Sequence, residues 1–274
     1  MPFRPRAALA SVLLLAGVLC VWQLATQPPA RKAGADAEYE AMVGGARKAG
    51  FPSPLQFGRT IVERLRHPLH DGGENDKGVA LQLLASLGRV LLGFLIAMTV
   101  ALPLGFGIGM SPLMLTALNP YIQLLKPISP LAWMPLALYT IKDASVSSIF
   151  VIAICSVWPM LINTAHGVAT VRRDWLNVAR TLEVTPLRRA LFVVLPAAAP
   201  TIVTGMRISM GIAWLVIVAA EMLVGGTGIG YFVWNQWNNL SLPDVLFAIL
   251  LIGITGMLLD LAFGSLTRLV AWRE

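Results

Sequence analysis

The sequence predicts an all-α, polytopic membrane protein with about six transmembrane helices. Its 274 residues are 57% hydrophobic and only 13% charged, and the mean hydropathy is +0.72. A soluble domain of this length would need far more charge to cover its surface. Apolar segments near or above the length of a membrane span also recur along the chain, separated by polar stretches.

Charge and cysteine content narrow the possible functions. The net charge of +7 comes largely from basic residues beside apolar segments, which is typical of orientation signals and contact with anionic lipid rather than of nucleic-acid binding. Cys20 and Cys155 lie in apolar segments and indicate neither a disulfide framework nor a metal site. The chain has no CxxC, HExxH or GxxxxGK[ST] motif, so we expect no ATP site of its own. We also expect no cofactor and no catalytic residues.

The N-terminal part is predicted to hold one membrane span and a polar segment. Residues 1–26 read as an uncleaved anchor with a cytoplasmic N-terminus, the alternative being a cleaved signal peptide. Residues 27–78 form an extracytoplasmic segment. Within it Phe57, Ile61 and Leu65 recur at helical spacing, which predicts an amphipathic helix packed against the bundle or lying on the outer membrane surface.

Residues 79–274 are predicted to form the main transmembrane domain. Its five spans are expected at residues 86–110, 118–141, 146–167, 201–223 and 245–266. With the first span, this places both termini and the arginine-rich loop 168–198 on one side, and the excess of arginine assigns that side to the cytoplasm. We find no internal repeat, so the inverted-repeat plan of many secondary carriers has no support.

The third of the six spans is unusual because it contains Lys126 and the prolines Pro127, Pro130 and Pro135. Prolines remove backbone donors, so this helix is predicted to be kinked or broken at membrane depth. Irregular backbone at that depth needs cover from protein or a water-filled cavity. Lys126 either lines an anion path or extends to the membrane interface, and both readings stay open.

Three further ionisable side chains lie in the last two spans. Arg207 is expected either to anchor structure, for example by pairing with the arginine-rich loop, or to meet the substrate. Glu221 and Asp260 favour a role in helix packing over proton relay, because no chain of ionisable neighbours gives a proton a route. The glycine run from Gly225 to Gly230 lacks the lysine of a phosphate loop and predicts a tight outer turn.

The loop between the fourth and fifth spans carries two helix starts. Asp174 is predicted to cap a helix from Trp175 to Leu182, and Thr185 with Pro186 to begin a second helix ending at Val194. Two short, exposed, basic helices between membrane spans suit the binding of a soluble cytoplasmic partner.

At this loop the chain resembles the inner-membrane permease subunits of bacterial ABC importers. Their loop pattern is E-A-A, three residues, Gly, nine residues and Ile-x-Leu-Pro. The corresponding positions here are Asn177, Val178, Ala179, Glu183, Val193, Leu195 and Pro196, and Asn177, Val178 and Glu183 depart from the pattern. Because glutamate replaces the glycine, we expect the bend between the two helices to differ in detail.

The resemblance extends over about residues 79–266, with segments such as LLKPISPLAWMPLALYTIKD and GMRISMGIAWLVIVAAEMLVGGTGIGYFVW. These are similar to the nitrate-transport permease branch, which is related to the taurine and alkanesulfonate permeases. The resemblance implies a type I importer half-channel in the bacterial inner membrane, paired with a second copy. It further implies an extracytoplasmic solute-binding protein and cytoplasmic ATPase subunits docked on the loop.

The expected function is import of a small inorganic anion, nitrate or also nitrite, with coupling through residues 174–196. Asp174, Arg180 and Thr185 join the motif positions as coupling residues, and Lys126, Pro127, Pro130, Arg207 and Glu221 are the candidate path residues. A taurine or alkanesulfonate permease and a self-contained ion-coupled anion carrier remain the alternatives.

Overall fold

The computed structural model describes residues 5–26, 51–73 and 76–270. The chain divides into two compact units, one made of residues 1–79 and 232–251 and the other of residues 80–231 and 252–274. The described residues are almost entirely helical, as the all-α prediction requires. Half of the predicted extracytoplasmic segment, residues 27–50 and 74–75, lies outside the described residues.

The first unit contains α1 (Pro5–Ala25) and α3 (Pro54–Arg66). α3 begins with a capping box, in which Ser53 and Gln56 each bind the other's backbone N–H. Trp22 near the end of α1 donates a hydrogen bond to the Pro52 carbonyl at 2.9 Å, and its ring packs on Phe57 of α3. The amphipathic helix predicted from Phe57, Ile61 and Leu65 is therefore confirmed, and its Phe57 face packs against protein.

α3 also binds the first turn of α12 (Leu242–Val270), within the same unit. Arg64 donates from Nε and Nη2 to the two carboxylate oxygens of Asp244, at 2.7 and 3.0 Å. The hydrogen bond to this carboxylate raises the pKa of Arg64 above its ordinary value. The Arg64 guanidinium also lies over the Phe232 ring, so a charge pair and a ring hold α3 in place.

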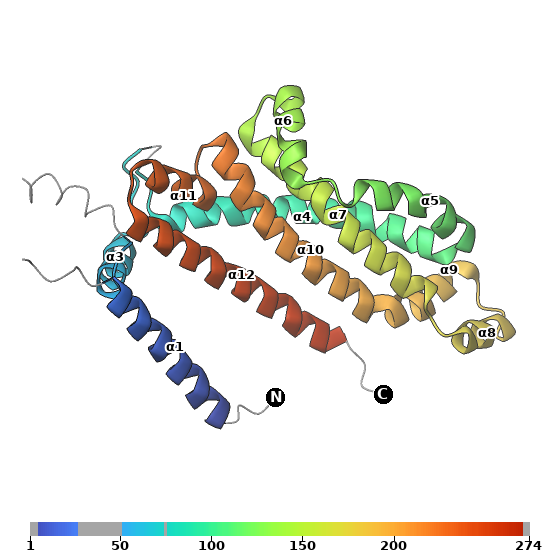
Figure 1. Ribbon diagram of the computed structural model, residues 1–274. Coiled ribbons are helices and arrows are strands. Elements are labelled where there is room, and N and C mark those ends of the chain that lie inside the picture. Colours follow the sequence, from blue (N-terminus) through green and yellow to red (C-terminus); the bar gives the residue numbers. More distant parts are fainter. Residues whose placement is uncertain (1–4, 27–50, 74–75, 271–274) are drawn as a thin grey trace, which may run out of the picture. The chain divides into compact units, whose positions relative to one another are not determined.

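The second unit is a helix bundle built around α7 (Ala144–Ala169) and α10 (Leu195–Val224), which run side by side (Figure 1). α4 (Val79–Met110) packs closely on α7 through glycines, because a Cβ on Gly105 or Gly109 would lie within 2.8 Å of α7 backbone oxygens. Gly205 of α10 faces Asn163 of α7 in the same way. Small residues thus let the helix backbones approach, as is usual in membrane bundles.

The other helices that lie wholly in this unit are short. α5 (Pro112–Leu125) and α6 (Pro130–Ile141) both contact α7. α11 (Ile229–Asn238) begins in this unit, after the glycine turn that follows α10, and continues into the first unit. α8 (Arg173–Thr181) and α9 (Pro186–Arg189) connect α7 to α10. A π-helical turn, Ala190–Val194, joins α9 to α10 without a break in the helix.

Four helices in the described residues are long and apolar enough to cross a membrane: Val79–Met110, Ala144–Ala169, Pro186–Val224 and Leu242–Arg268. They correspond to the second, fourth, fifth and sixth predicted spans, although the helices begin earlier than expected. The first predicted span is the helix α1. The third is the pair α5 and α6, which confirms the predicted break in that span.

Candidate functional site

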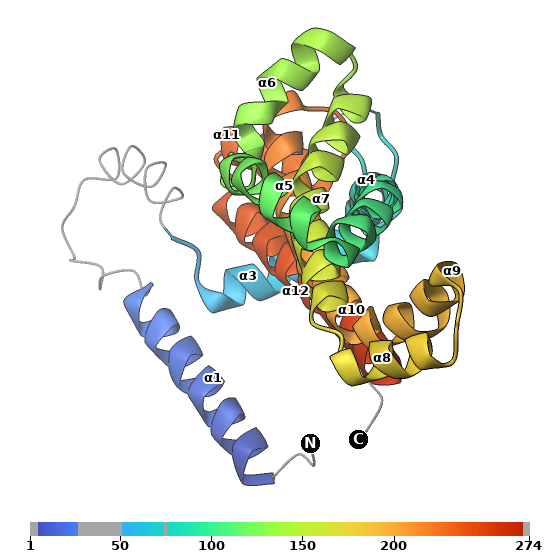
Figure 2. The same cartoon turned by 90° about the vertical axis from the view of Figure 1, so that its right-hand side faces the viewer.

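The connection from α7 to α10 folds into a helical hairpin at one end of these two long helices (Figure 2). α8 starts at Arg173, and its N-cap is Arg172, whose side chain makes no capping hydrogen bond. The prediction that Asp174 caps this helix is therefore wrong. Asp174 lies in the first turn instead, where its carboxylate still favours the positive end of the helix dipole.

Glu183 makes the bend between α8 and α9. The φ of Glu183 is 54°, in the left-handed region. The Val184 N–H donates a hydrogen bond to the Ala179 carbonyl, and the Glu183 N–H donates one to the Arg180 carbonyl. Together these two hydrogen bonds form a Schellman motif. Glu183 thus adopts a left-handed conformation that glycine takes readily, so the replacement of glycine does not prevent the turn. The cost of a left-handed non-glycine residue is roughly 1–2 kcal/mol.

The second predicted helix begins where expected, with Thr185 as N-cap and Pro186 as first helical residue, although the Thr185 side chain makes no capping hydrogen bond. It does not end at Val194, because the chain continues through the π turn into α10. Pro196 explains the position of this turn. Without an N–H it cannot bond the carbonyl four residues earlier, and its ring clashes with a regular turn.

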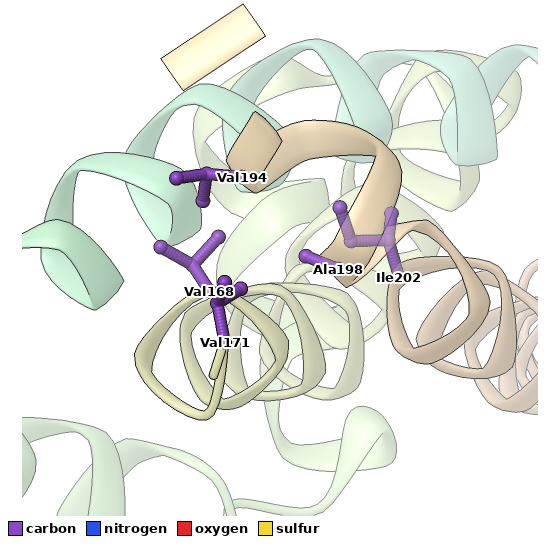
Figure 3. Packing of buried hydrophobic residues seen from close by; sticks show 5 residues of the cluster. All are labelled: Val168, Val171, Val194, Ala198 and Ile202. Atoms are coloured by element: carbon purple, nitrogen blue, oxygen red, sulfur yellow. The ribbon is translucent and has the colours of Figure 1, made fainter. Parts of the chain in front are cut away.

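A buried apolar cluster fastens the hairpin to the long helices (Figure 3). The end of α7 contributes Val168, with Val171 just beyond it, and the start of α10 contributes Ala198 and Ile202. Val194 of the π turn is only 1% exposed and packs into the same cluster. Leu176 of α8 packs against the cluster, which therefore links α8 to α7 and α10.

The helix α8 presents two different faces. Arg173, Asn177 and Arg180 recur at helical spacing and line a cavity. The opposite face carries apolar side chains that are exposed, namely Trp175 (43%), Val178 (59%) and Leu182 (71%). Of the other motif positions, Ala179 is buried, Val193 is half-buried, and Leu195 and Pro196 are exposed. The three exposed apolar side chains form what we call the docking face.

The break between α5 and α6 spans Lys126 to Ser129. Lys126 caps the end of α5, and its backbone N–H donates to the Ile122 carbonyl. Pro130 is the first residue of α6, a position where its missing N–H costs no helical bond. Lys126 and Pro127 are exposed on this unit.

Arg207 pairs with Asp260 and not with the arginine-rich loop. Its Nε and Nη2 donate to the two carboxylate oxygens of Asp260 at 2.6 and 2.5 Å. Both side chains are about half exposed on the isolated chain. A charge pair inside two apolar helices faces lipid only at high cost, so this face requires water or a second protein surface.

Glu221 lies at the centre of a buried network and is 2% exposed. Its carboxylate accepts hydrogen bonds from the Ser86 hydroxyl at 2.8 Å, from Arg89 Nη1 at 2.7 Å and from the Gly230 N–H at 3.0 Å. Arg89 also donates to the Thr227 carbonyl at 2.7 Å. The network joins α4, α10 and the glycine turn, which agrees with the packing role favoured for Glu221.

The glycine turn makes this network possible. Gly225 and Gly226 have φ of 80° and 92°, which confirms the predicted tight turn. A Cβ on Gly228 would lie 2.2 Å from the carboxyl carbon of Glu221, so only glycine lets the turn approach the carboxylate this closely.

The candidate path residues do not form one cluster. Arg207 and Glu221 are on one helix, about 21 Å apart along its axis at 1.5 Å per residue, and each has its own partner. Arg89 and Ser86 were not predicted from the sequence. A signal for them existed, since an arginine in one span and a glutamate in another form the pairing expected of charges at membrane depth.

Comparisons with known proteins agree with this architecture. The family described as "Binding-protein-dependent transport system inner membrane component" matches residues 90–273. The nitrate import permease protein NrtB of Synechocystis sp. is 43% identical over 82% of this chain and 82% of its own length. The bicarbonate transport system permease protein CmpB of the same organism is 40% identical over 80% of this chain.

Solved structures agree on the fold. An inward-facing structure of the MetNI methionine ABC transporter matches with a TM-score of 0.62 at 14% identity, covering 71% of this chain and 96% of that one. The matched fold is that of a chain of this ABC transporter.

Proposed function

Since the chain belongs to the family of binding-protein-dependent transport system inner membrane components, we propose that it is the permease of an ABC importer that carries nitrate. Membership implies cytoplasmic ATPase subunits and an extracytoplasmic binding protein as partners, and a place in the inner membrane as a multi-pass protein. The chain is a transport subunit and not an enzyme. The observation that carries nitrate as cargo is the 43% identity to a nitrate import permease across most of both chains.

Bicarbonate is the second candidate cargo. The bicarbonate permease relative is 40% identical, only slightly less than the nitrate relative, and both cargoes are small planar oxyanions. The same scaffold therefore suits either anion.

The ATPase subunits dock on α8 in this proposal. The docking face of Trp175, Val178 and Leu182 is apolar, exposed and on the opposite side from the cavity. Tryptophans such as Trp175 are frequent buried anchors of protein interfaces, and neighbouring apolar contacts exclude water around them. Movement of the ATPases would displace α8, and Leu176 and the buried apolar cluster around Val194 would pass this displacement on to α7 and α10. Motion of these two helices would then open the path alternately to each side of the membrane.

Lys126 and Arg207 are the positive charges we assign to the anion path, with Pro127 and Pro130 holding the α5–α6 break open to water. A second copy of the chain would complete the path and cover the exposed Arg207–Asp260 pair, while lipid surrounds the outer helices. Both termini and the hairpin are assigned to the cytoplasm by the arginine-rich loop. Glu221 supports the path from outside it, by fixing the glycine turn.

The test is reconstituted uptake. Permease, ATPase subunits and binding protein are placed in vesicles with ATP on the ATPase side, and uptake of isotopically labelled nitrate is measured with and without excess bicarbonate. ATP-dependent nitrate uptake that bicarbonate does not inhibit supports nitrate as cargo. Bicarbonate uptake without nitrate uptake would assign the other anion, and uptake without ATPase subunits would refute the importer.

A matched pair of variants tests the docking face. Leu182→Asp places a charge in the proposed interface and should abolish binding of the ATPase subunits, whereas Leu187→Asp, equally exposed in α9, should leave it unchanged. Co-purification of the subunits is the measurement. Equal co-purification of both variants would show that the ATPases bind elsewhere.

A further inference from the structure

A cavity of about 580 Å³ lies beside α8 within the second unit. Three arginines line it, Arg173 and Arg180 from α8 and Arg189 from the end of α9, together with Asn177. The rest of the lining is apolar or glycine and includes Leu115 of α5. Among the residues that the structure describes, no carboxylate lines the cavity.

The three arginines carry uncompensated charge. In the described part of the chain none of them takes part in an ion pair, and the neighbouring Asp174 pairs with Arg172. Guanidinium groups stay charged at any physiological pH, so three of them around one cavity repel one another. An anion with several oxygens would relieve that repulsion and accept their hydrogen bonds, as phosphate does.

The cavity is at the ends of membrane helices. Met110 is the last residue of α4, Ala169 is the last of α7, and both line the cavity. Basic pockets between transmembrane helices at the membrane boundary are typical binding places for anionic lipid headgroups. The apolar lining suits the glycerol and upper acyl carbons of a lipid, whereas a bare oxyanion would leave it unfilled.

We propose that this cavity binds the phosphate of an anionic phospholipid such as phosphatidylglycerol. Arg173, Arg180 and Arg189 hold the phosphate, and Asn177 holds a headgroup hydroxyl. The lipid then ties one face of α8 to the membrane while the docking face stays free for the ATPases. The proposal rests on the chain being a membrane permease and is independent of which anion it carries.

The experiment measures lipid binding to the full-length permease, purified with its ATPase subunits in mild detergent. Short-chain phosphatidylglycerol and phosphatidylcholine are titrated separately, and bound lipid is counted by native mass spectrometry. We expect phosphatidylglycerol to bind at least tenfold more tightly. Arg180→Gln and Arg189→Gln should each weaken its binding about fivefold, the effect of one basic residue near a headgroup.

Arg188→Gln is the matched control, because Arg188 is exposed on the same helix as Arg189 but does not line the cavity. It should leave lipid affinity unchanged. The proposal fails if the two lipids bind equally, or if all three variants behave alike. It also fails if millimolar inorganic phosphate displaces phosphatidylglycerol, since the cavity would then be a site for free anions.

Thermal unfolding of each variant shows whether it is folded, and Arg173→Gln replaces either of the two cavity variants, Arg180→Gln or Arg189→Gln, if it is not. Because the titration contains neither cargo nor ATP, an absence of lipid binding would not count against the proposed nitrate import. Conversely, absence of nitrate uptake would leave the lipid result unaffected.

Discussion

Replacing Glu221 by glutamine tests whether the buried network holds the glycine turn against the bundle. The substitution keeps the shape of the side chain but removes its negative charge. The new amide NH₂ must then face one of the donors that the carboxylate satisfied, from Ser86, Arg89 or Gly230. Arg89 would keep only its neutral acceptors, the Thr227 carbonyl and the Ser145 hydroxyl.

The expected cost follows from these contacts. Removing one partner of a buried ion pair leaves an uncompensated charge and costs roughly 3–5 kcal/mol. We therefore expect the free energy of unfolding to fall by about 4 kcal/mol. Removing both charges, in Arg89→Met with Glu221→Gln, should recover part of that loss, because no buried charge is then left unpaired.

The measurement is equilibrium unfolding of the purified permease in mixed detergent micelles, followed by tryptophan fluorescence. Glu63→Gln is the matched control, since Glu63 is exposed on α3 and should change stability by less than about 0.5 kcal/mol. A Glu221→Gln variant as stable as this control would refute the argument. The argument would also be refuted if the double variant lost as much free energy of unfolding as the single variants Arg89→Met and Glu221→Gln lose together.

Three further substitutions probe other parts of the structure by the same unfolding measurement. Glu183→Gly should stabilise the hairpin by about 1 kcal/mol, because glycine adopts the left-handed φ without strain; Glu183→Ala should give no such gain, and equal effects of the two would contradict this reason. Val194→Ala should cost about 2 kcal/mol by opening a cavity in the cluster of Figure 3, and a neutral result would show that the cluster repacks. Gly228→Ala should destabilise as Glu221→Gln does, because its Cβ would overlap that carboxylate; Gly211→Ala, with open space around it, should not.

Local sequence patterns predicted the elements well. Long apolar runs located the spans, because a helix that crosses hydrocarbon must be apolar along its whole length. Pro127 and Pro130 located the break between α5 and α6, because a proline removes a helical hydrogen bond at its own position. Pro186 located the start of α9 for the same reason.

Side-chain partners could not be predicted in this way. Arg89 and Glu221 are separated by 132 positions, and Arg64 and Asp244 by 180, so only the packed helices bring them together. The bend at Glu183 was missed because backbone hydrogen bonds of the Schellman motif outweigh the modest preference against a left-handed glutamate. At Asp174 the helix began two residues earlier than the capping pattern indicated, at Arg173 instead of Trp175.

The π-helical turn Ala190–Val194 determines how α9, which precedes it, is rotated about the helix axis relative to α10. Each residue turns an α-helix by about 100°, so deleting one residue between Ala190 and Val194 to restore a regular helix would swing Arg189 a quarter-turn or more around the axis. The guanidinium would leave the cavity beside α8 while the membrane part of α10 stayed in register. The extra residue of the π turn thus lets one continuous helix place Arg189 at the cavity beside α8 and keep α10 in its orientation in the membrane.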